Sequence, residues 1–367
     1  MSHRTMPHTR TAGALVAPNI TIGLDLGDRT SRLCELDGSG AVSREASLAT
    51  TSAAMTRYFG GRERCRVVLE VGTHSPWLSR LLQELGHEVI VANPAAMYGQ
   101  RRRRGRRHRN DQLDAAFLAR QGRADVTLLH PITHRSAQAQ EHLEVIRARD
   151  QLVRTRTKLI NHVRGTVKAT GARIPTSSAA AFARHAGNAL PAELRASLTP
   201  LLEVIGDLTR RIARFDQQVE TIAAQAYPVV ARLRAPAGVG PLTALTYVLL
   251  VEDPNRFGSS RSVGPYFGLV PQLDNSSDST PQLRITKTGD ELGRRLLVSA
   301  AHYILGPFGP DCDLRRHGEA IARRGGKNAK KRAVIAVARK LAVLLHRLWV
   351  SEQAYDPQYV ATRRVAV

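Results

Sequence analysis

The first hundred residues alternate between short apolar runs and polar turns, a pattern typical of strands and short helices. Residues 20–26 (ITIGLDL) form a buried-strand signal that ends in a glycine and an acid. Residues 31–37 and 41–47, joined by a turn at 38–40, predict two further strands in an antiparallel meander. The pattern then predicts a helix at 51–58, a strand at 66–71, a helix at 76–85 and a strand at 88–92. These elements indicate one mixed α/β sheet.

A long helical stretch follows at residues 136–226 and predicts two amphipathic helices. They span 141–170 and 192–226 and are separated by a break at 171–178 that contains glycine, proline and serine. Apolar side chains in the second helix recur at three- and four-residue spacings. This spacing fits a bundle packed on itself and a dimer-forming coiled coil equally well.

The rest of the chain is predicted to be mainly helical. It opens on the turn-rich sequence APAGVGP, contains a loop-rich stretch at 268–289, and closes with a basic helix at 330–349. The predicted division is a disordered basic tail (1–18), an α/β domain (19–125), a helical or coiled-coil connector (126–230), a mainly helical domain (231–350) and a tail (351–367).

Charge narrows the possible partners. The chain has 54 Lys and Arg against 31 Asp and Glu, a formal charge of +23, which is the footprint of a nucleic-acid binder. A ribosome-associated or merely basic protein has the same balance. Aromatic residues make up only 5%, which argues against base stacking as the main binding device. Three widely spaced cysteines and no apolar run of membrane-spanning length indicate a reducing cytoplasm and no membrane partner.

Four carboxylates stand at the ends of predicted elements. The element order over 19–125 resembles an RNase H-like sheet, in which Asp25 on the first strand and Glu70 on the fourth point into one crevice. Asp111 and Asp114 are three residues apart at a helix start, which puts them on one face. Four hard oxygen ligands suit Mg²⁺ ions that assist attack on a phosphodiester. Taken singly, Asp111 also fits a helix N-cap and Glu70 a solvated strand end.

A rival interpretation comes from residues 23–27 (GLDLG). They resemble the phosphate-binding strand-turn-strand of actin-like and sugar-kinase ATPases, whose fold is related to that of RNase H. Such an ATPase needs a second Asp-x-Gly loop and an adenosine motif, and the chain has no convincing copy of either.

Several motifs in a fixed order carry a more specific resemblance. GLD at 23–25, VLE at 68–70, VIVANP at 89–94 and DxxDA at 111–115 resemble the RuvC-like half of the DEDD transposases of the one-ten and eleven-eleven groups of bacterial insertion sequences. GVGPLTA at 238–244 is similar to that family's helix-hairpin-helix start, and GLVP at 268–271, Ser276 and ITKTG at 285–289 follow in its order. The motifs cover nearly all of the chain outside its tails.

The resemblance implies a recombinase that moves its own DNA element. It implies Mg²⁺ held by Asp25, Glu70, Asp111 and Asp114, and a serine transposase domain in which Ser276 attacks DNA to form a phosphoserine intermediate. It further implies that a bridge RNA selects element-end and target DNA. The expected assembly is a homo-oligomer, a dimer that associates to a tetramer, in the bacterial cytoplasm at the nucleoid.

The chain departs from the family pattern at two places. Arg109 and Asn110 replace the usual Lys-Thr before the first paired acid, which keeps the charge but loses the hydroxyl. Ser276 and Ser277 replace the usual Ser-Gly, so Ser277 is the alternative nucleophile. Both serines also fit simple turn caps in the polar run 274–280.

Basic segments predict the nucleic-acid surfaces. The run before the paired acids has no interleaved aromatic residue and suits phosphate contacts with a duplex or a folded RNA, although a targeting signal or a solvated loop has the same composition. The 238–240 turn offers backbone N–H groups, and the cations near 284–287 can neutralise a phosphate. The expected nucleic-acid-binding residues are Arg101, Arg102, Arg103, Arg104, Arg106, Arg107, Arg109, Gly238, Gly240, Arg284, Lys287, Lys330, Lys331 and Arg332.

Two other functions stay open at this point. A RuvC-like Holliday-junction or structure-specific nuclease without covalent serine chemistry needs the four acids but not Ser276. A non-catalytic nucleic-acid-binding protein needs neither, and only its basic surface matters.

Overall fold

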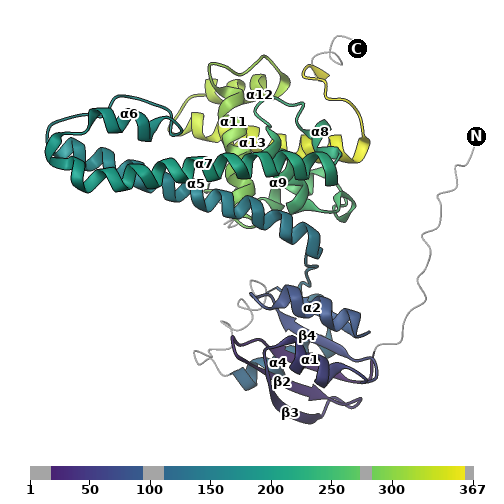
Figure 1. Ribbon diagram of the computed structural model, residues 1–367. Helices are drawn as coiled ribbons and strands as arrows, with labels where there is room; N and C mark the ends of the chain where they lie inside the picture. Colours follow the sequence, from purple (N-terminus) through teal and green to yellow (C-terminus); the bar gives the residue numbers. More distant parts are fainter. Residues whose placement is uncertain (1–17, 94–110, 273–282, 360–367) are drawn as a thin grey trace, which may run out of the picture. The chain divides into compact units, whose positions relative to one another are not determined.

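The chain folds into two compact units, residues 1–135 and 136–367, each described here by itself. The structure, a computed structural model, describes residues 18–93, 111–272 and 283–359 (Figure 1). The first unit combines a sheet with helices, and the second is mostly helical. The predicted boundary between connector and last domain, at 230/231, falls inside the second unit, and we keep it as a prediction.

The first unit is built on a five-stranded mixed sheet of order β3-β2-β1-β4-β5. The antiparallel meander consists of β1 (Thr21–Asp25), β2 (Thr30–Leu36) and β3 (Val42–Ala49). Strands β4 (Arg66–Glu70) and β5 (Glu88–Ala92) extend the sheet in parallel on the other side of β1. The predicted strands are confirmed, and β1 lies at the centre of the sheet.

Helices cover the two faces of this sheet. On one face, α1 (Ser52–Phe59) and α2 (Ser75–Glu84) pack against the apolar side chains of β1 and β4. On the other face lies α4 (Asp111–Ala124), followed by the short 3-10 turn η1 (Val126–Leu129). Because both faces are covered, most side chains of β1 and β4 are buried.

The second unit begins with a hairpin of two long helices, α5 (Ala137–Ala169) and α7 (Arg195–Ala226). Between them lie α6 (Phe182–Ala189) and the 3-10 turn η2 (Ala192–Leu194). Phe182 of α6 is fully buried among apolar side chains of both long helices. The two long helices that the apolar spacing predicts are therefore confirmed, they pack on each other as a hairpin within the chain, and α6 packs against them.

The further described helices form a core that packs against the hairpin through α8 (Val229–Leu233) and α9 (Pro241–Val251). The others are α10 (Val263–Tyr266), α11 (Glu291–Leu305), α12 (Asp313–Arg323) and α13 (Ala329–Ser351), with the 3-10 turns η3 (Pro254–Arg256) and η4 (Ser260–Ser262). Helix α9 is buried almost all round, which places it at the centre of this core. Among the described helices, none is long and apolar enough to cross a membrane.

Candidate functional site

Two of the predicted acids end neighbouring parallel strands. Leu24 of β1 is paired in register with Leu69 of β4, so Asp25 and Glu70, the next residues, stand at the same level of the sheet. Both side chains are half-buried. The carboxyl ends of parallel strands meet at one edge of a sheet, which is where ligands bind in such folds. The register therefore brings together two acids that are 45 positions apart in sequence.

The two acids also lie on the same face of the sheet. Side chains alternate between faces along a strand, so Asp25 shares a face with Gly23, and Glu70 shares a face with Val68. That face belongs to α4, because a Cβ on Gly23 would lie 2.0 Å from the Ala115 carbonyl oxygen, and one on Gly122 would lie 2.2 Å from a Val68 methyl. Both acids therefore lie on the face that α4 covers.

The direction of α4 brings its first turn towards these acids. At its other end, Arg66 at the start of β4 donates to the Gly122 carbonyl (2.9 Å), and Arg123 donates to the Asn19 carbonyl (3.4 Å) just before β1. Helix α4 thus runs antiparallel to β1 and β4, and its N-terminus lies towards their carboxyl ends. Asp114, half-buried, directly precedes the Ala115 that lies against Gly23.

The chemical type of the predicted ligand side chains suits a divalent cation. Asp25, Glu70 and Asp114 are carboxylates, the hard oxygen ligands that Mg²⁺ prefers. Asp111 begins α4, and its side chain lies outside the described part of the structure. Among the described residues, no three His, Cys, Asp or Glu side chains already form a metal-binding group. The case for a metal site therefore rests on the carboxylate chemistry of these residues and on the strand ends and helix start that position them.

The segment that carries the predicted nucleophile has a well-defined stem. Ser276 and Ser277 lie outside the described residues, but the stretches on either side of the segment are hydrogen-bonded to each other. The amide of Gln272 donates to Arg284 (2.8 Å), and that of Thr286 donates to Val270 (2.9 Å). Gly268 has a positive φ of 63°, and a Cβ there would lie 2.3 Å from the Thr288 carbonyl oxygen. Only glycine permits this close approach.

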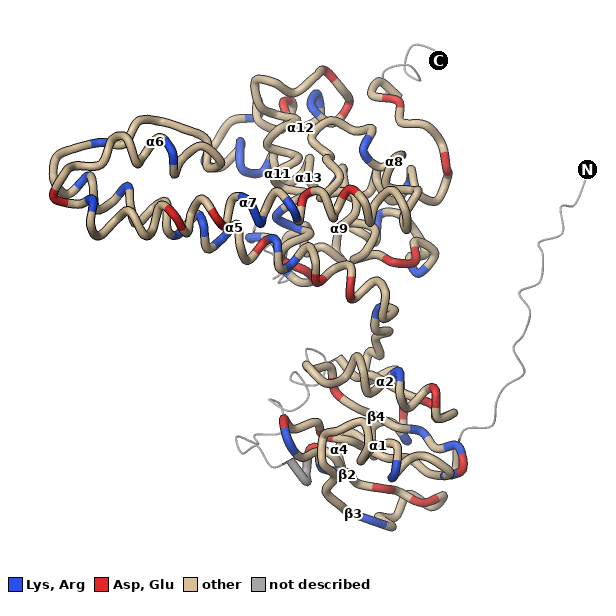
Figure 2. Tube along the Cα trace, viewed as in Figure 1, with Lys and Arg blue, Asp and Glu red and all other residues tan. Residues whose placement is uncertain are grey.

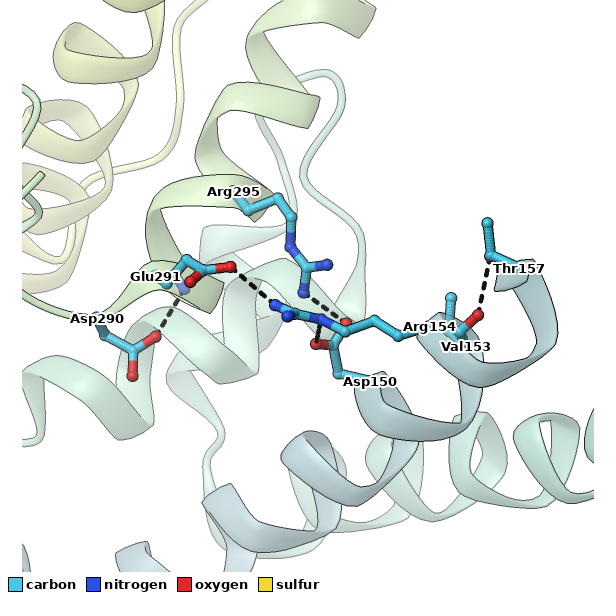
Figure 3. Close-up of polar contacts among 8 residues, drawn as sticks. Asp150, Val153, Arg154, Thr157, Asp290, Glu291 and Arg295 are labelled. Carbon is cyan, nitrogen blue, oxygen red and sulfur yellow. Dashed lines mark hydrogen bonds and ion pairs between the residues drawn. The ribbon is translucent and has the colours of Figure 1, made fainter. Parts of the chain in front are cut away.

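Arginines brace the stem and the helix that follows it. Arg294 of α11 donates to the carbonyls of Thr288 (2.9 Å) and Phe267 (3.3 Å), one from each side of the stem. Figure 3 shows the neighbouring ion-pair network, in which Asp150 of α5 accepts from Arg154 (2.9 Å) and Arg295 (2.5 Å). Arg154 also reaches Glu291 at 2.9 Å. The start of α11 is thereby tied to α5.

The predicted nucleic-acid residues fall into three groups. Arg101, Arg102, Arg103, Arg104, Arg106, Arg107 and Arg109 all lie outside the described residues. Gly238 has a positive φ of 78°, and a Cβ there would lie 2.8 Å from the Ala300 carbonyl oxygen. Gly240 is the N-cap residue of α9, and no side chain accepts a capping hydrogen bond from the amides of the first turn. A Cβ on Gly240 would meet nothing within 4 Å. The turn is therefore packed tightly against α11 at Gly238, whereas no described atom crowds it at Gly240.

The third group consists of cations on exposed loops and helix ends. Arg284 and Lys287 are exposed on the stem, and Lys287 holds the left-handed φ of 56° that non-glycine residues rarely adopt. Lys330 and Lys331 are exposed in the first turn of α13, where the helix dipole disfavours positive charge. Arg332 is half-buried and donates to the Gly325 carbonyl (3.2 Å), which gives it a local structural role. Figure 2 shows that basic positions also recur along α5 and α7.

The cysteines do not offer a rival nucleophile. Cys34, Cys65 and Cys312 are buried and free. Burial raises the pKa of Cys65 to about 11 and raises that of Cys34 as well, so both stay protonated near neutral pH.

Sequence reasoning missed the residues that position the site. Gly23 was noted only as part of a strand motif, although glycine inside a strand often marks a close approach of another backbone. Arg295 and Asp150 gave no signal, because their pairing joins residues 145 positions apart. Arg294 gave none, because it binds backbone carbonyls, which no side-chain motif marks.

Comparisons with known proteins agree on one family. Residues 22–171 match a family model described as a transposase, of the DEDD type of IS110, and residues 230–310 match the transposase IS116/IS110/IS902 family. A Pseudomonas aeruginosa protein named "Probable family 20 transposase" is 27% identical over 344 residues, 92% of this chain and 98% of the relative. The transposase for insertion sequence element IS1111A of Coxiella burnetii is 25% identical, over 91% of this chain and 90% of the relative. The transposase for IS1328 of Yersinia enterocolitica is 27% identical, over 77% and 84%.

Proposed function

Because the chain belongs to the IS110/IS116/IS902 family of insertion-sequence transposases, we propose that it cuts and rejoins DNA through a phosphoserine intermediate. In this proposal Asp25, Glu70, Asp111 and Asp114 hold Mg²⁺ in a RuvC-like, RNase H-like domain, and Ser276 is the nucleophile. The partners are element-end DNA, target DNA and a bridge RNA that selects them.

The observation that supports the acid set best is the shared position of Asp25 and Glu70. They stand at the same level of neighbouring strands, on the face covered by α4. The N-terminal end of α4 carries a partial positive charge that favours nearby carboxylates. A mixed sheet of order β3-β2-β1-β4-β5 is consistent with a DEDD nuclease-like domain.

The proposed bond exchange is a transesterification. The Ser276 oxygen forms a bond to phosphorus, the bond from phosphorus to the leaving sugar oxygen breaks, and the serine proton is transferred to a base while the leaving oxygen gains a proton. Bound Mg²⁺ would act as a Lewis acid on the phosphate oxygens. Arg284 and Lys287, exposed on the stem, would offset the negative charge of the phosphate.

A protein–DNA adduct is the direct test. The full chain, purified with its bound RNA, is incubated with end-labelled element-end DNA and Mg²⁺, and the products are separated on a denaturing gel. We expect an adduct that Ser276→Ala abolishes and Ser277→Ala retains. An adduct lost only in Ser277→Ala moves the nucleophile by one residue, and an adduct unaffected by both changes contradicts the serine mechanism.

The same experiment separates the rival functions. Cleavage without any adduct, lost in Asp25→Asn but kept in Ser276→Ala, indicates a structure-specific nuclease. Binding without cleavage in any condition indicates a non-catalytic nucleic-acid-binding protein. The bridge RNA is tested by RNase treatment before the reaction, which is expected to abolish target selection, and light scattering tests the proposed dimer and tetramer.

A further inference from the structure

Two residues with exposed aromatic side chains stand near the end of α11. Phe308 is 83% exposed, the highest value among the large hydrophobic side chains of the described residues, and Tyr303 is 48% exposed. Phe308 lies in the short loop Gly-Pro-Phe-Gly-Pro that joins α11 to α12 (Figure 1). The loop folds back on α11, because a Cβ on Gly309 would lie 2.7 Å from the Tyr303 carbonyl oxygen.

The loop is held in a single shape that keeps Phe308 in solvent. One guanidinium nitrogen of Arg315 donates to the carbonyls of Ile304 (3.0 Å), Gly306 (2.8 Å) and Gly309 (2.8 Å). The amide of Gly309 also donates to Gly306 at 3.2 Å. Pro307 directly precedes Phe308 and Pro310 follows two residues later, which further restricts the backbone of this loop. Its exposure is a property of a braced loop, so little conformational entropy is lost when a partner covers the ring.

Tyr303 connects this loop to the turn before α9. A Cβ on Gly238 would lie 3.2 Å from Cδ1 of Tyr303, so the tyrosine ring lies against the turn at residues 236–240. The Gly240 end of that turn is open, and no side chain caps the first amides of α9. Tyr303 therefore borders the turn that leads into α9, a helix whose first amides no side chain caps.

Patch size and charge decide between a protein and a nucleic acid as the partner. An aromatic side chain buries roughly 150–250 Å², whereas a stable protein interface needs about 800 Å² from each partner. The other exposed large hydrophobics of the described part of the second unit, Val204 and Val350, lie on α7 and α13. The formal charge of +23 attracts a nucleic acid, which is a polyanion. An exposed aromatic ring can then stack on an unpaired nucleobase of that nucleic acid.

We propose that Phe308 is a stacking platform for an unpaired base of the nucleic acid that this protein binds, with the exposed Tyr303 at the end of α11 as a second aromatic side chain of the same region. The proposal rests on the nucleic-acid binding of the proposed function. It adds to that function one contact residue, Phe308, and one feature of the bound nucleic acid, a base that is single-stranded or unstacked. It also refines the expectation drawn from the low aromatic content, since stacking needs few rings when they are exposed and rigid.

The test compares single-stranded DNA with its own duplex. The full chain is titrated into a mixed-sequence single strand that contains 2-aminopurine, and into the matched duplex, with anisotropy for affinity and fluorescence quenching for stacking. We expect Phe308→Ala and Phe308→Leu to weaken single-strand binding about 5- to 150-fold and to reduce the quenching, and Phe308→Trp to preserve both. Duplex binding and its salt dependence are expected to stay unchanged in all variants.

Val350→Ala is the matched control, because it truncates an exposed apolar side chain (51%) elsewhere in the same unit. If Phe308→Leu bound the single strand as tightly as wild type, the stacking proposal would be overturned. It would also be overturned if the only change in Phe308→Ala were a smaller oligomer in light scattering. If the wild-type protein bound neither DNA, the proposed function itself would fail; if it bound both and Phe308→Ala changed nothing, only the stacking platform would fail.

Discussion

Gly23 in the central strand lies directly against Ala115 in α4, so close that a Cβ at position 23 would stand 2.0 Å from the Ala115 carbonyl oxygen. The same Cβ would stand 2.4 Å from the Ala119 amide nitrogen. Two backbones in contact leave no room for a side chain, and neither can relax as a flexible side chain can. This contact sets the depth at which α4 sits on the sheet, and with it the position of Asp114 relative to Asp25.

Replacing Gly23 should therefore damage both stability and activity. We expect Gly23→Ala to lower the free energy of unfolding by about 1–3 kcal/mol or more, because overpacking here forces α4 away from β1. Urea denaturation measures the loss, and the adduct assay measures activity. Gly38→Ala is the control, since a Cβ there meets nothing within 4 Å, and it should stay within about 0.5 kcal/mol of wild type. Equal effects of the two changes would contradict the packing argument.

The acid set should be required for cutting but not for binding. Asp25→Asn and Glu70→Gln keep the shape of each side chain and remove its charge, so we expect DNA cleavage to fall about 100-fold or more while DNA affinity is kept. Asp28→Asn provides the comparison, because Asp28 follows the same strand but is 93% exposed.

Removing the metal should reproduce the loss seen in the acid variants. Excess EDTA is expected to stop cleavage by the wild-type protein and excess Mg²⁺ to restore it, with cleavage followed on the same gels. Full activity of the Asp25 and Glu70 variants, or full activity in EDTA, would remove the case for a metal site at these strand ends.

Asp150 should contribute more to stability than a similar acid on α7. The Asp150 side chain is 17% exposed and bridges Arg154 and Arg295. The Nε atom of Arg295 is buried without a hydrogen-bond partner. We expect Asp150→Ala to cost about 1–2 kcal/mol, because it removes two charge-assisted hydrogen bonds of a mostly buried carboxylate, while water still reaches the partly exposed guanidinium groups of Arg154 and Arg295. Asp207 also pairs with two arginines but is 44% exposed, so Asp207→Ala should cost at most about 1 kcal/mol. Thermal or urea unfolding distinguishes the two.

His134 should make the first unit less stable in mild acid. Burial first, and then the charges of Arg80 and Arg135, lower the pKa of His134 below its ordinary 6.5. Folding therefore favours the neutral ring, and this contribution is complete above pH 6.5 and is lost as the pH falls below it. The unfolding temperature should drop from about pH 7.5 to about pH 5, and less so in His134→Gln.

The exposed His185 on α6 supplies the comparison for that pH series. His185→Gln makes the same substitution at an exposed position and controls for the loss of one imidazole. A profile of His134→Gln that is superimposable on wild type would show that the buried ring does not titrate with folding.

The sheet of the first unit was largely predictable, because its strands are short, well separated and marked by apolar runs with clear turns. The strands at Thr21–Asp25 and Glu88–Ala92 and the long helices α5 and α7 were anticipated within a few residues. Helix α6 was not anticipated, because its eight residues are too few for a periodic signal and it is held by Phe182 packing on other helices.

The candidate site was predictable in part. Asp25, Glu70 and Asp114 follow from motifs at element ends, since local sequence marks where a strand stops and a helix begins. That Asp25 and Glu70 share a crevice was expected only from the resemblance to an RNase H-like sheet. Local sequence does not encode it, because it depends on the register of Leu24 with Leu69 and on the direction in which α4 crosses the sheet. The roles of Arg294 and Arg315 were also hidden, because each binds carbonyls of a loop rather than a partner with a recognisable pattern.

Local chemistry thus accounts for the elements, the basic character and the identity of the acids, because each depends on residues that are neighbours in the chain. Three-dimensional packing accounts for the meeting of Asp25 with Glu70, for the contact of Gly23 with Ala115, and for the exposure of Phe308. These depend on contacts between distant residues, where a backbone approach that leaves no room for a Cβ, or a single arginine, decides which side chain is held in place.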